Sequence, residues 1–375
     1  MPQFPSVDAL LTDAISHQVF PGAAYGVLQR GKPVLLASIG GFTYQPDSPR
    51  VEPETVFDMA SVTKAMATTA MAMLLWQRGQ LDLDEPVAAW LPEFLRTAVA
   101  MGAVDDARQH VTVRMLLGHC SGLPAYARLF EQHSTSPALL NACLEMPLEA
   151  TPGTRAVYSD IGFIILGRLL EAVAGERLDK FCHREIFMPL GMNSTMFCPP
   201  AERKPAIPPT STGDNFRSGI VQGEVHDENC WVLGGVSGHA GLFSNVADTL
   251  RFAACLLCGG DPLFQSETVA LFTSRQKDPP ATEWALGWDT PTTPSSSGQF
   301  FSPHSAGHLG YTGTSLWIDF EKDLAIVLLT NRTYPGGVAE KVSKNIQQVR
   351  PRFHDVLMRE LGWSVPGKVL PGSAS

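Results

Sequence analysis

Short apolar runs near both ends of the chain predict β-strands. Residues 30–32 (RGK) separate the first two runs and residues 320–323 (FEKD) separate the last two, so each pair is predicted to form a hairpin. The predicted strands are 22–29, 33–40, 307–312, 314–319 and 324–331.

Longer segments with apolar residues at helical spacing lie between and outside these runs. Gly79 and Gly175 follow two of these segments and are typical helix stops. The predicted helices include 6–18, 61–78, 160–174 and about 338–361.

This order of elements predicts an α+β fold. One antiparallel five-stranded sheet would be built from both chain ends, with flanking helices, and a mostly helical lobe would be inserted between its halves. We expect a discontinuous sheet domain (1–79 and 240–365), a mostly helical domain (80–239) and a flexible Gly/Ser/Pro-rich tail (366–375).

Composition and charge exclude some classes of function. Hydrophobic residues make up 44% of the chain and charged residues 17%, as in a globular protein with a large core. The formal net charge is −9 and no basic run stands out, so a nucleic-acid partner is not expected. The longest apolar stretch, 65–76, is too short to span a membrane, and the N-terminus lacks a signal-peptide pattern. We therefore expect a cytoplasmic protein.

The seven cysteines have irregular spacing and predict free thiols. Cys255 and Cys258 form the one CxxC pair, but it ends a predicted helix, whereas a redox pair needs a helix N-terminus. A zinc site would need a second pair, which the sequence lacks. We expect neither a metal nor a cofactor.

The sharpest chemical feature is SVTK at 61–64, at the start of a predicted helix. Residues i and i+3 share a helix face, so the Lys64 amine would lie beside the Ser61 hydroxyl. A serine needs a base to become a nucleophile, and a lysine with a lowered pKa can be that base. Alone, this pattern also fits a helix cap beside a solvated lysine.

Two later elements support a catalytic interpretation. Tyr158 precedes the predicted 160–174 helix and is suited to relay a proton, while Asp160 is placed to bond Lys64 or substrate. The segment GHLGYTG at 307–313 reads as a glycine-containing strand that would admit a ligand and direct His308 into a cleft, as a cation or hydrogen-bond donor.

These three elements, in this order, resemble the serine β-lactamase and DD-peptidase family. SxxK, YxD and HxG match best the class C branch with its esterase-like relatives. The resemblance spans roughly residues 5–361 and includes these segments: FDMASVTKAMAT (57–68), GQLDLDEPVAAWLPEF (79–94), VTVRMLLGHCSGLP (111–124), TPGTRAVYSDIGFIILGRLLE (151–171), EVHDENCWVLGGVSGHAGLFS (224–244) and GHLGYTGTSLWIDFEKDLAIVLLTNR (307–332).

The resemblance implies the same α+β fold that the order of predicted strands and helices indicates. It also implies a catalytic role for each residue that matches a family motif. Ser61 would be the acylated nucleophile, Lys64 its partner and Tyr158 the general acid/base. His308 would stand where the third motif has Lys or His. The backbone N–H groups of Ser61 and Tyr311 would form the oxyanion hole.

Other residues are weaker candidates for the site. Gly310 belongs to the third motif, and the aromatic residues Tyr126 and Trp231 would either line the cleft or simply pack. His119 and His239 are expected to have structural roles. A metal site made of His239 and the HDE segment at 226–228 is disfavoured, because these residues lie far apart on loops.

Three features depart from the family pattern. Asp160 replaces the usual Asn, and a carboxylate there would keep Lys64 charged and favour Tyr158 as the base. Leu309 replaces a Thr or Ser that often helps hold a substrate carboxylate, which weakens a strict DD-carboxypeptidase or β-lactamase assignment. The third departure is the missing secretion signal.

The sequence thus predicts a serine hydrolase that forms an acyl-enzyme on Ser61. The preferred substrates are small esters, or D-amino-acid or muropeptide-type amides. A β-lactamase or DD-carboxypeptidase is the first alternative, a non-catalytic protein that binds peptidoglycan fragments is another, and a metal-dependent hydrolase is the third. The base (Lys64 or Tyr158), the exact substrate and the oligomeric state stay open.

Overall fold

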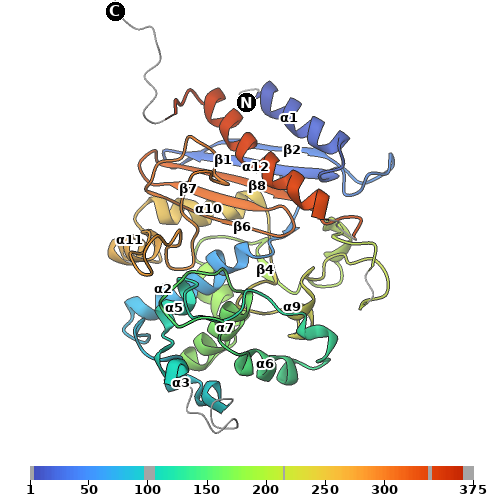
Figure 1. Cartoon of the computed structure of the whole chain (residues 1–375). Helices are drawn as coiled ribbons and strands as arrows, with labels where there is room; N and C mark the ends of the chain where they lie inside the picture. Colours follow the sequence, from blue (N-terminus) through green and yellow to red (C-terminus); the bar gives the residue numbers. More distant parts are fainter. Residues whose placement is uncertain (1–3, 97–105, 214–215, 337–339, 366–375) are drawn as a thin grey trace, which may run out of the picture.

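A five-stranded antiparallel sheet in the order β2-β1-β8-β7-β6 organises the molecule (Figure 1). The computed structural model describes residues 4–96, 106–213, 216–336 and 340–365. The strands of this sheet are β1 (Gly22–Gln29), β2 (Lys32–Gly40), β6 (Ser305–Leu309), β7 (Ser315–Asp319) and β8 (Leu324–Thr330).

The sheet joins the two ends of the chain. Strands β1 and β2 form the first hairpin, and β1 also pairs along its length with β8, from Ala23↔Thr330 to Gln29↔Leu324. Strands β8, β7 and β6 complete the sheet by antiparallel pairing. The predicted α+β class and the predicted sheet built from both termini are therefore confirmed.

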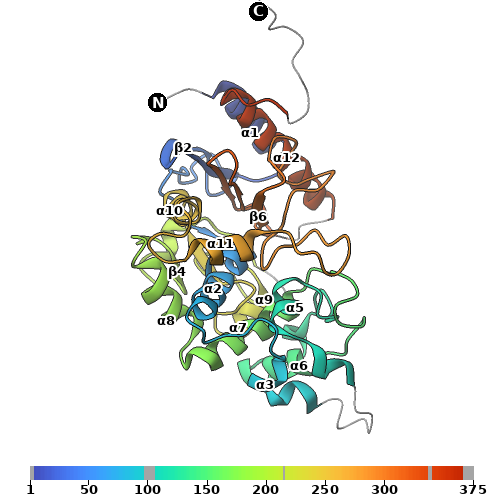
Figure 2. The ribbon, with the colours of Figure 1, turned by 90° about the vertical axis from the view of Figure 1, so that its left-hand side faces the viewer.

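Alternate side chains of the central strands enter two different cores. Tyr25 and Val27 pack with helices α1 (Pro5–Ser16) and α12 (Glu340–Glu360) on the outer face. Ala24 and Leu28 point into the larger core on the inner face. Helix α10 packs on that inner face, against β1 and β8, and Figure 2 shows it between the sheet and the helical region. The period of two in the sequence is the physical cause of this division.

The remaining helices form a second region below the sheet in Figure 1. Helix α7 runs through its centre and is buried along most of its length. The described α-helices of the inner face and the helical region are α2 (Ala70–Gln77), α3 (Val87–Trp90), α5 (Val113–Leu117), α6 (Ser136–Glu145), α7 (Asp160–Ala174), α8 (Leu178–Cys182), α9 (Glu228–Val232), α10 (Val246–Leu257) and α11 (Ser266–Thr273).

A small second sheet, β3-β5-β4, joins the two regions and was not predicted. Its strands are only two or three residues long: β3 (Phe57–Asp58), β4 (Met196–Phe197) and β5 (Leu242–Ser244). Such short runs carry too little periodicity to be recognised in a sequence. The sheet matters because β3 leads directly into Ser61.

One strand prediction needs correction. Strand β6 covers Ser305–Leu309, not 307–312, because the chain turns at Gly310. The Gly310 amide donates to the Thr314 carbonyl at 2.7 Å, and the Gly313 amide donates back to Gly310. Gly307 lies in the strand, but Gly310 and Gly313 make a tight turn instead.

The largest apolar core runs through both regions and includes residues of α2, α7, α10 and β8. The division of the chain after residues 79 and 239 therefore stays a proposal. The tail at 366–375 and the first residues of the predicted terminal helix lie outside the described residues.

Three further observations bear on the sequence-based expectations. All seven cysteines are free, and Cys255 donates its thiol to the Gly260 carbonyl at the end of α10. Across the described ranges, no helix has the length and apolar character needed to cross a bilayer. In the same part of the chain, no group of three or more His, Cys, Asp or Glu side chains is arranged to hold a metal ion.

Two glycines of α7 offer a matched test of its packing. A Cβ at Gly167 would lie 2.8 Å from the Gly238 backbone, whereas a Cβ at Gly162 would be at an ordinary 3.4 Å from Ser159. We expect Gly167→Ala to lower the free energy of unfolding by about 1–3 kcal/mol, since the backbone must move. Urea denaturation measures both variants. Equal stability of Gly167→Ala and Gly162→Ala would contradict this contact.

Candidate active site

Ser61 stands on a strained turn between β3 and a helix. The preceding residue, Ala60, has φ of 46°, which a residue with a Cβ adopts only when its surroundings enforce it. Asp58 enforces it here, because one carboxylate oxygen accepts the Ala60 amide at 2.8 Å while the other accepts the His226 amide at 2.7 Å. Burial raises the pKa of Asp58 to about 6, against the effect of these two amide bonds, which lower it. Asp58 thereby fixes the direction of the nucleophile.

Lys64 is fully buried one turn after Ser61, at the start of a π-helical segment (Lys64–Thr69) that continues into α2. Its Nζ lies 3.0 Å from Ser61 Oγ, 2.6 Å from Asp160 Oδ1 and 3.1 Å from the His239 carbonyl. A neutral amine has two N–H bonds and one lone pair. An ammonium donates to all three oxygens, whereas a neutral amine donates to Asp160 and His239 and turns its lone pair to the Ser61 hydroxyl.

Burial of Lys64 acts in favour of the neutral form. Burial lowers its pKa and outweighs the neighbouring Asp160 carboxylate, which raises it. The sequence left the base open, since a lowered pKa would favour Lys64 and a charge-stabilising Asp160 would favour Tyr158. The complete burial of the amine was not visible in the sequence.

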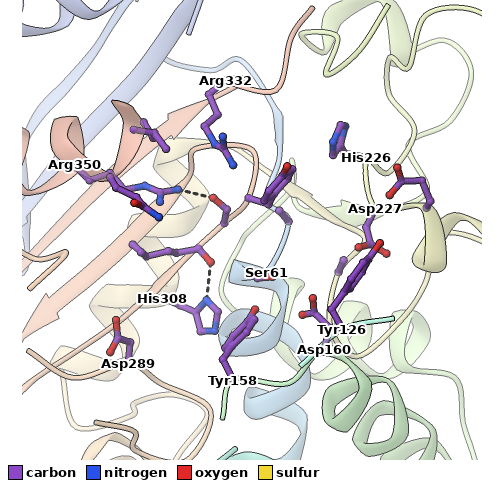
Figure 3. A pocket seen from close by; sticks show the side chains of 18 of the residues that line it. Ser61, Tyr126, Tyr158, Asp160, His226, Asp227, Asp289, His308, Arg332 and Arg350 are labelled. Carbon is purple, nitrogen blue, oxygen red and sulfur yellow. Dashed lines mark hydrogen bonds between the residues drawn. The ribbon is translucent and has the colours of Figure 1, made fainter. Parts of the chain in front are cut away.

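Tyr158 lies in the loop before α7 and faces Ser61 from the helical region (Figure 3). Lys64 Nζ is 4.8 Å from the centroid of its ring. Burial, followed by the charge of Asp160, raises the pKa of Tyr158 well above its ordinary value, and its contact with Ser61 offsets this only in part. Tyr158 thus holds its proton firmly, as suits a donor.

His119 supports Tyr158 from behind. Its ring centroid is 4.8 Å from that of Tyr158 and 4.5 Å from that of Trp284. His119 Nδ1 accepts the Ser159 amide at 3.1 Å, and the Ser159 hydroxyl caps α7 by accepting the Gly162 amide. Burial lowers the pKa of His119 far below its usual value, so the ring stays neutral. These contacts fix the Tyr158-Ser159-Asp160 segment.

His308 reaches the pocket from β6, but not as a cation. Its Nδ1 bonds the Leu309 carbonyl at 2.9 Å, which makes Nδ1 the protonated nitrogen and leaves Nε2 as an acceptor. Burial is the main cause that lowers the pKa of His308 to about 3. The expectation of a cation or hydrogen-bond donor directed into the cleft is therefore wrong at neutral pH.

The turn after β6 packs directly on the turn that carries Ser61. Thr312 donates its hydroxyl to the Asp58 carbonyl at 2.8 Å, and Thr314 donates to the Met59 carbonyl at 2.9 Å. Arg350 holds the turn from α12 through the carbonyls of Gly310 and Thr314. Two threonine hydroxyls thus set the distance between the backbones of Ser61 and Tyr311.

These side chains border one pocket of about 670 Å³ between the sheet and the helical region. Figure 3 shows Arg332 and Arg350 on the side of the sheet, and Tyr126, Asp160 and Asp227 on the opposite side. The pocket lining includes Ser61, Tyr126, Tyr158, Asp160, Trp284, His308, Gly310, Tyr311 and Arg332.

Two predicted site residues do not line this pocket: Lys64, which is buried behind Ser61, and Trp231. Trp231 lies away from the site. It lies on the short helix α9, packs edge-on against Phe216 and donates its indole N–H to Glu224 at 3.2 Å. Its side chain is turned outward, and 41% of the residue is exposed. The sequence-based choice of Trp231 rested on its aromatic character alone, which does not set its direction.

His239 and Asp227 form a buried pair and not a metal site. His239 Nε2 lies 2.8 Å from Asp227 Oδ1, and its Nδ1 lies 2.9 Å from the Ser237 hydroxyl. Burial raises the pKa of the Asp227 carboxyl, but His239 and the Cys230 amide outweigh it and leave that pKa at about 2. The pair fixes the loop whose carbonyl at residue 239 holds Lys64.

Sequence reasoning missed several groups of this site, including Thr312, Thr314 and Arg350. Asp58 stands two residues before the Ala60-Ser61 turn, a position that could have suggested a cap. Trp284 comes from a loop with no local signal. The His239 carbonyl is a backbone group, and Arg332 follows the last strand, where a buried cation was not expected.

Comparison with known proteins agrees with this geometry. The Beta-lactamase family matches residues 7–350 of the chain. The chain belongs to this family of serine hydrolases. A putative D-alanyl-D-alanine carboxypeptidase of Salmonella agona is 33% identical over 322 residues, which cover 78% of this chain and 73% of the relative.

Solved structures share the beta-lactamase-like fold at lower identity. An octameric penicillin-binding protein homologue from Pyrococcus abyssi has a TM-score of 0.72 at 21% identity, covering 96% of this chain and 78% of its own. EstCE1, a hydrolase with promiscuous acyltransferase activity, has a TM-score of 0.73 at 22% identity, covering 92% and 98%. At these identities the likeness shows the fold alone.

The close approach of the two turns gives a first prediction for this beta-lactamase-family site. A Cβ at Gly310 would lie 2.5 Å from the Met59 carbonyl and 2.0 Å from the Thr314 hydroxyl. Gly310→Ala should separate the turns and reduce kcat for ester hydrolysis about 100-fold or more, as expected when an oxyanion donor is displaced. Gly162→Ala is the control. Wild-type kcat in folded Gly310→Ala would refute this function of the turn.

Asp160 gives a second prediction. Its carboxylate raises the pKa of Lys64, so Asp160→Asn should lower that pKa further. If neutral Lys64 is the base, the rising limb of acylation rate against pH moves to lower pH. Stopped-flow release of p-nitrophenol from a p-nitrophenyl ester measures this limb. Asp84→Asn, at an exposed pair with Arg114, is the matched control. A shift to higher pH, or none, would exclude Lys64 as the titrating base.

Proposed function

We propose that this protein is an esterase or amidase for small acyl compounds, including D-amino-acid derivatives, and that it acts through an acyl-enzyme on Ser61. The observation that carries the proposal is the 3.0 Å contact between Ser61 Oγ and the buried Lys64 Nζ, at the wall of a 670 Å³ pocket. The helix N-terminus at Ser61 adds a positive field for the developing anion.

Lys64 takes the Ser61 proton as Oγ attacks the substrate carbonyl. Its two remaining contacts, with Asp160 and the His239 carbonyl, stabilise the ammonium that forms. The lone pair of the neutral amine is thereby directed at the hydroxyl before reaction. Tyr158 is the weaker candidate for this role, because burial raises its pKa well above the ordinary value.

Two backbone N–H groups are proposed to hold the oxyanion. Among the described residues, the amides of Ser61 and Tyr311 donate to no backbone or side-chain acceptor. The threonine bonds from the β6–β7 turn keep the two segments side by side. Donors that are fixed before reaction stabilise the charge of the tetrahedral intermediate without reorganisation.

Tyr158 is proposed to protonate the leaving group, because its hydroxyl contacts Ser61 and keeps its proton. The Lys64 ammonium then gives its proton to the Tyr158 phenolate, which restores both groups. In deacylation, water gives a proton to Lys64 as it attacks the acyl carbon, and Ser61 Oγ takes a proton from the Lys64 ammonium as the acid is released. The neutral His308 borders this exchange, and its Nε2 has no partner within the protein and is free to accept a hydrogen bond from a ligand.

The pocket favours small substrates over long polymers. Leu309 supplies no hydroxyl at the centre of the third motif, which supports an esterase or amidase over a β-lactamase. The name of the Salmonella agona relative supports the second candidate, a DD-carboxypeptidase. A cytoplasmic location remains a prediction from the sequence.

Intact mass after mixing with p-nitrophenyl butyrate, and separately with benzylpenicillin, tests the proposal. Wild-type protein should release p-nitrophenol and carry an acyl group, while Ser61→Ala should lose turnover by about 10³-fold or more, since a nucleophile is removed. Near wild-type turnover in Ser61→Ala would refute the mechanism.

The same samples separate the alternatives. A persistent penicillin adduct, with cleavage of an acyl-D-Ala-D-Ala peptide and no ester turnover, would favour the DD-carboxypeptidase. Rapid penicillin hydrolysis would favour a β-lactamase. Acylation without turnover of any substrate would favour a protein that only binds peptidoglycan fragments.

A further inference from the structure

One carboxylate at the pocket wall has no cationic partner among the described residues. We propose that Asp289, with the Trp284 ring beside it, forms a subsite for an ammonium group on the leaving group of the substrate. This inference rests on the proposed function, because the reaction at Ser61 defines which part of the substrate departs.

Two carboxylates on the opposite side of the pocket are already engaged. Asp160 lies 2.6 Å from Lys64 Nζ. Asp227 lies 2.8 Å from His239 Nε2. Each of these contacts explains why a negative charge stands there, since a carboxylate that is removed from water needs a partner.

Asp289 differs from them. It is half-buried and lines the pocket, and no Lys, Arg or His side chain pairs with it in the part of the chain that the structure describes. The Arg275 guanidinium bonds the Thr290 hydroxyl and the Pro291 carbonyl instead. Burial raises the pKa of Asp289 to about 7, and its contacts with the Thr290 amide and Ser296 lower it only in part. A bound cation would supply the missing partner and favour the ionised form.

Backbone pairing fixes Asp289 beside Trp284. Asp289 exchanges two backbone hydrogen bonds with Gly307 of β6, at 2.8 and 2.9 Å, and so extends the edge of the sheet by one residue. It also stands opposite Trp284 in a second antiparallel bridge. Residues directly opposite in such a bridge have their side chains on the same face, with Cβ atoms about 5 Å apart. The carboxylate and the indole ring are therefore neighbours in the pocket wall.

The groups at this end of the pocket attract a positive ligand. The Asp289 carboxylate supplies negative charge, and the face of an indole ring attracts a cation. His308, whose ring centroid is 6.3 Å from that of Trp284, adds the unpartnered acceptor Nε2. An ammonium has N–H groups to donate to such acceptors, whereas a carboxylate has none and would be repelled by Asp289.

The subsite lies on the side of the leaving group. The ring centroid of Trp284 is 5.5 Å from that of Tyr158, which is the proposed proton donor to the leaving atom. In Figure 3, Asp289 lies on one side of Tyr158 and Tyr126 lies on the other. An ammonium held by Asp289 thus belongs to the group that departs, while the acyl chain extends toward Tyr126. The substrate class is therefore an ester of an amino alcohol or an amide of a diamine.

A matched pair of esters tests the subsite. 2-(Dimethylamino)ethyl acetate carries a protonated amine at pH 7, and 3-methylbutyl acetate has nearly the same shape with C–H in place of N–H. Proton NMR of the released acetate gives kcat/KM for both. The ratio of the two values, amino ester over neutral ester, should fall about 10- to 100-fold from wild type to Asp289→Asn, the range for a hydrogen bond to a charged group. Comparing ratios between proteins cancels the intrinsic reactivity of the esters.

Glu283→Gln is the matched control. Glu283 directly precedes Trp284, is exposed and does not line the pocket, so its substitution removes one negative charge nearby without touching the subsite. This variant should keep the wild-type ratio to within about 3-fold. Unfolding temperatures identify a variant that fails to fold. If Asp289→Asn does so, Asp289→Ser, which keeps a hydroxyl near the Thr290 amide, takes its place.

Binding to Ser61→Ala protein gives a readout without catalysis. Ligand-observed NMR at millimolar concentration gives Kd for each of the two esters. The preference for the amino ester, taken as the ratio of the two Kd values, should fall about 10-fold or more in Ser61→Ala/Asp289→Asn. Ser61→Ala/Glu283→Gln should keep the preference.

The outcomes separate this inference from the proposed function. A ratio of kcat/KM that differs by less than about 3-fold between wild type and folded Asp289→Asn overturns the subsite, even if Ser61-dependent ester turnover is found. An equal loss of the preference in Glu283→Gln also overturns it, because the effect would then be one of net charge. Binding of the amino ester that depends on Asp289, in a protein whose wild type turns over no ester or amide, supports the subsite and refutes the proposed function.

Discussion

The burial of Lys64 is the constraint on which the site depends. An amine removed from water must be neutral or must be surrounded by acceptors. Here the Asp160 carboxylate and the His239 carbonyl each accept a hydrogen bond from Lys64 Nζ, and the third contact of Nζ is Ser61 Oγ. Burial acts to leave the lone pair of the amine free for the Ser61 hydroxyl, and Asp160 and the His239 carbonyl stabilise the ammonium once the proton is taken.

The architecture explains how these groups come together. Ser61 and Lys64 start the helix that follows β3, Asp160 begins α7, and the residue-239 carbonyl precedes β5. The helical region and the sheet region therefore both contribute, and neither holds a complete site alone. The π-helical segment at Lys64 and the close contact between Gly167 and Gly238 bring the backbones near enough for one amine to reach all three partners.

Sequence reasoning predicted the sheet from local periodicity and turns, and the reactive pair from its spacing together with the two later motifs. Strand β1 has the predicted bounds, 22–29, since a turn marks its end, and Ser61 and Lys64 share a helix face by spacing alone. The charge state of His308, the outward direction of Trp231 and the role of Asp58 depend on burial and on partners distant in sequence. Periodicity carries no information on such contacts.

The most direct test of the account is the rate at which a neutral alkyl fluorophosphonate labels Ser61, measured from pH 5 to pH 11 in wild type and in Lys64→Arg, with the labelled peptide identified by mass spectrometry. An arginine keeps its charge over this range and cannot accept the serine proton. The account predicts a rising limb in wild type with an apparent pKa below that of a free lysine, and in folded Lys64→Arg labelling about 10³-fold slower without that limb. Labelling of Lys64→Arg at the wild-type rate, or with the same rising limb, would contradict Lys64 as the base.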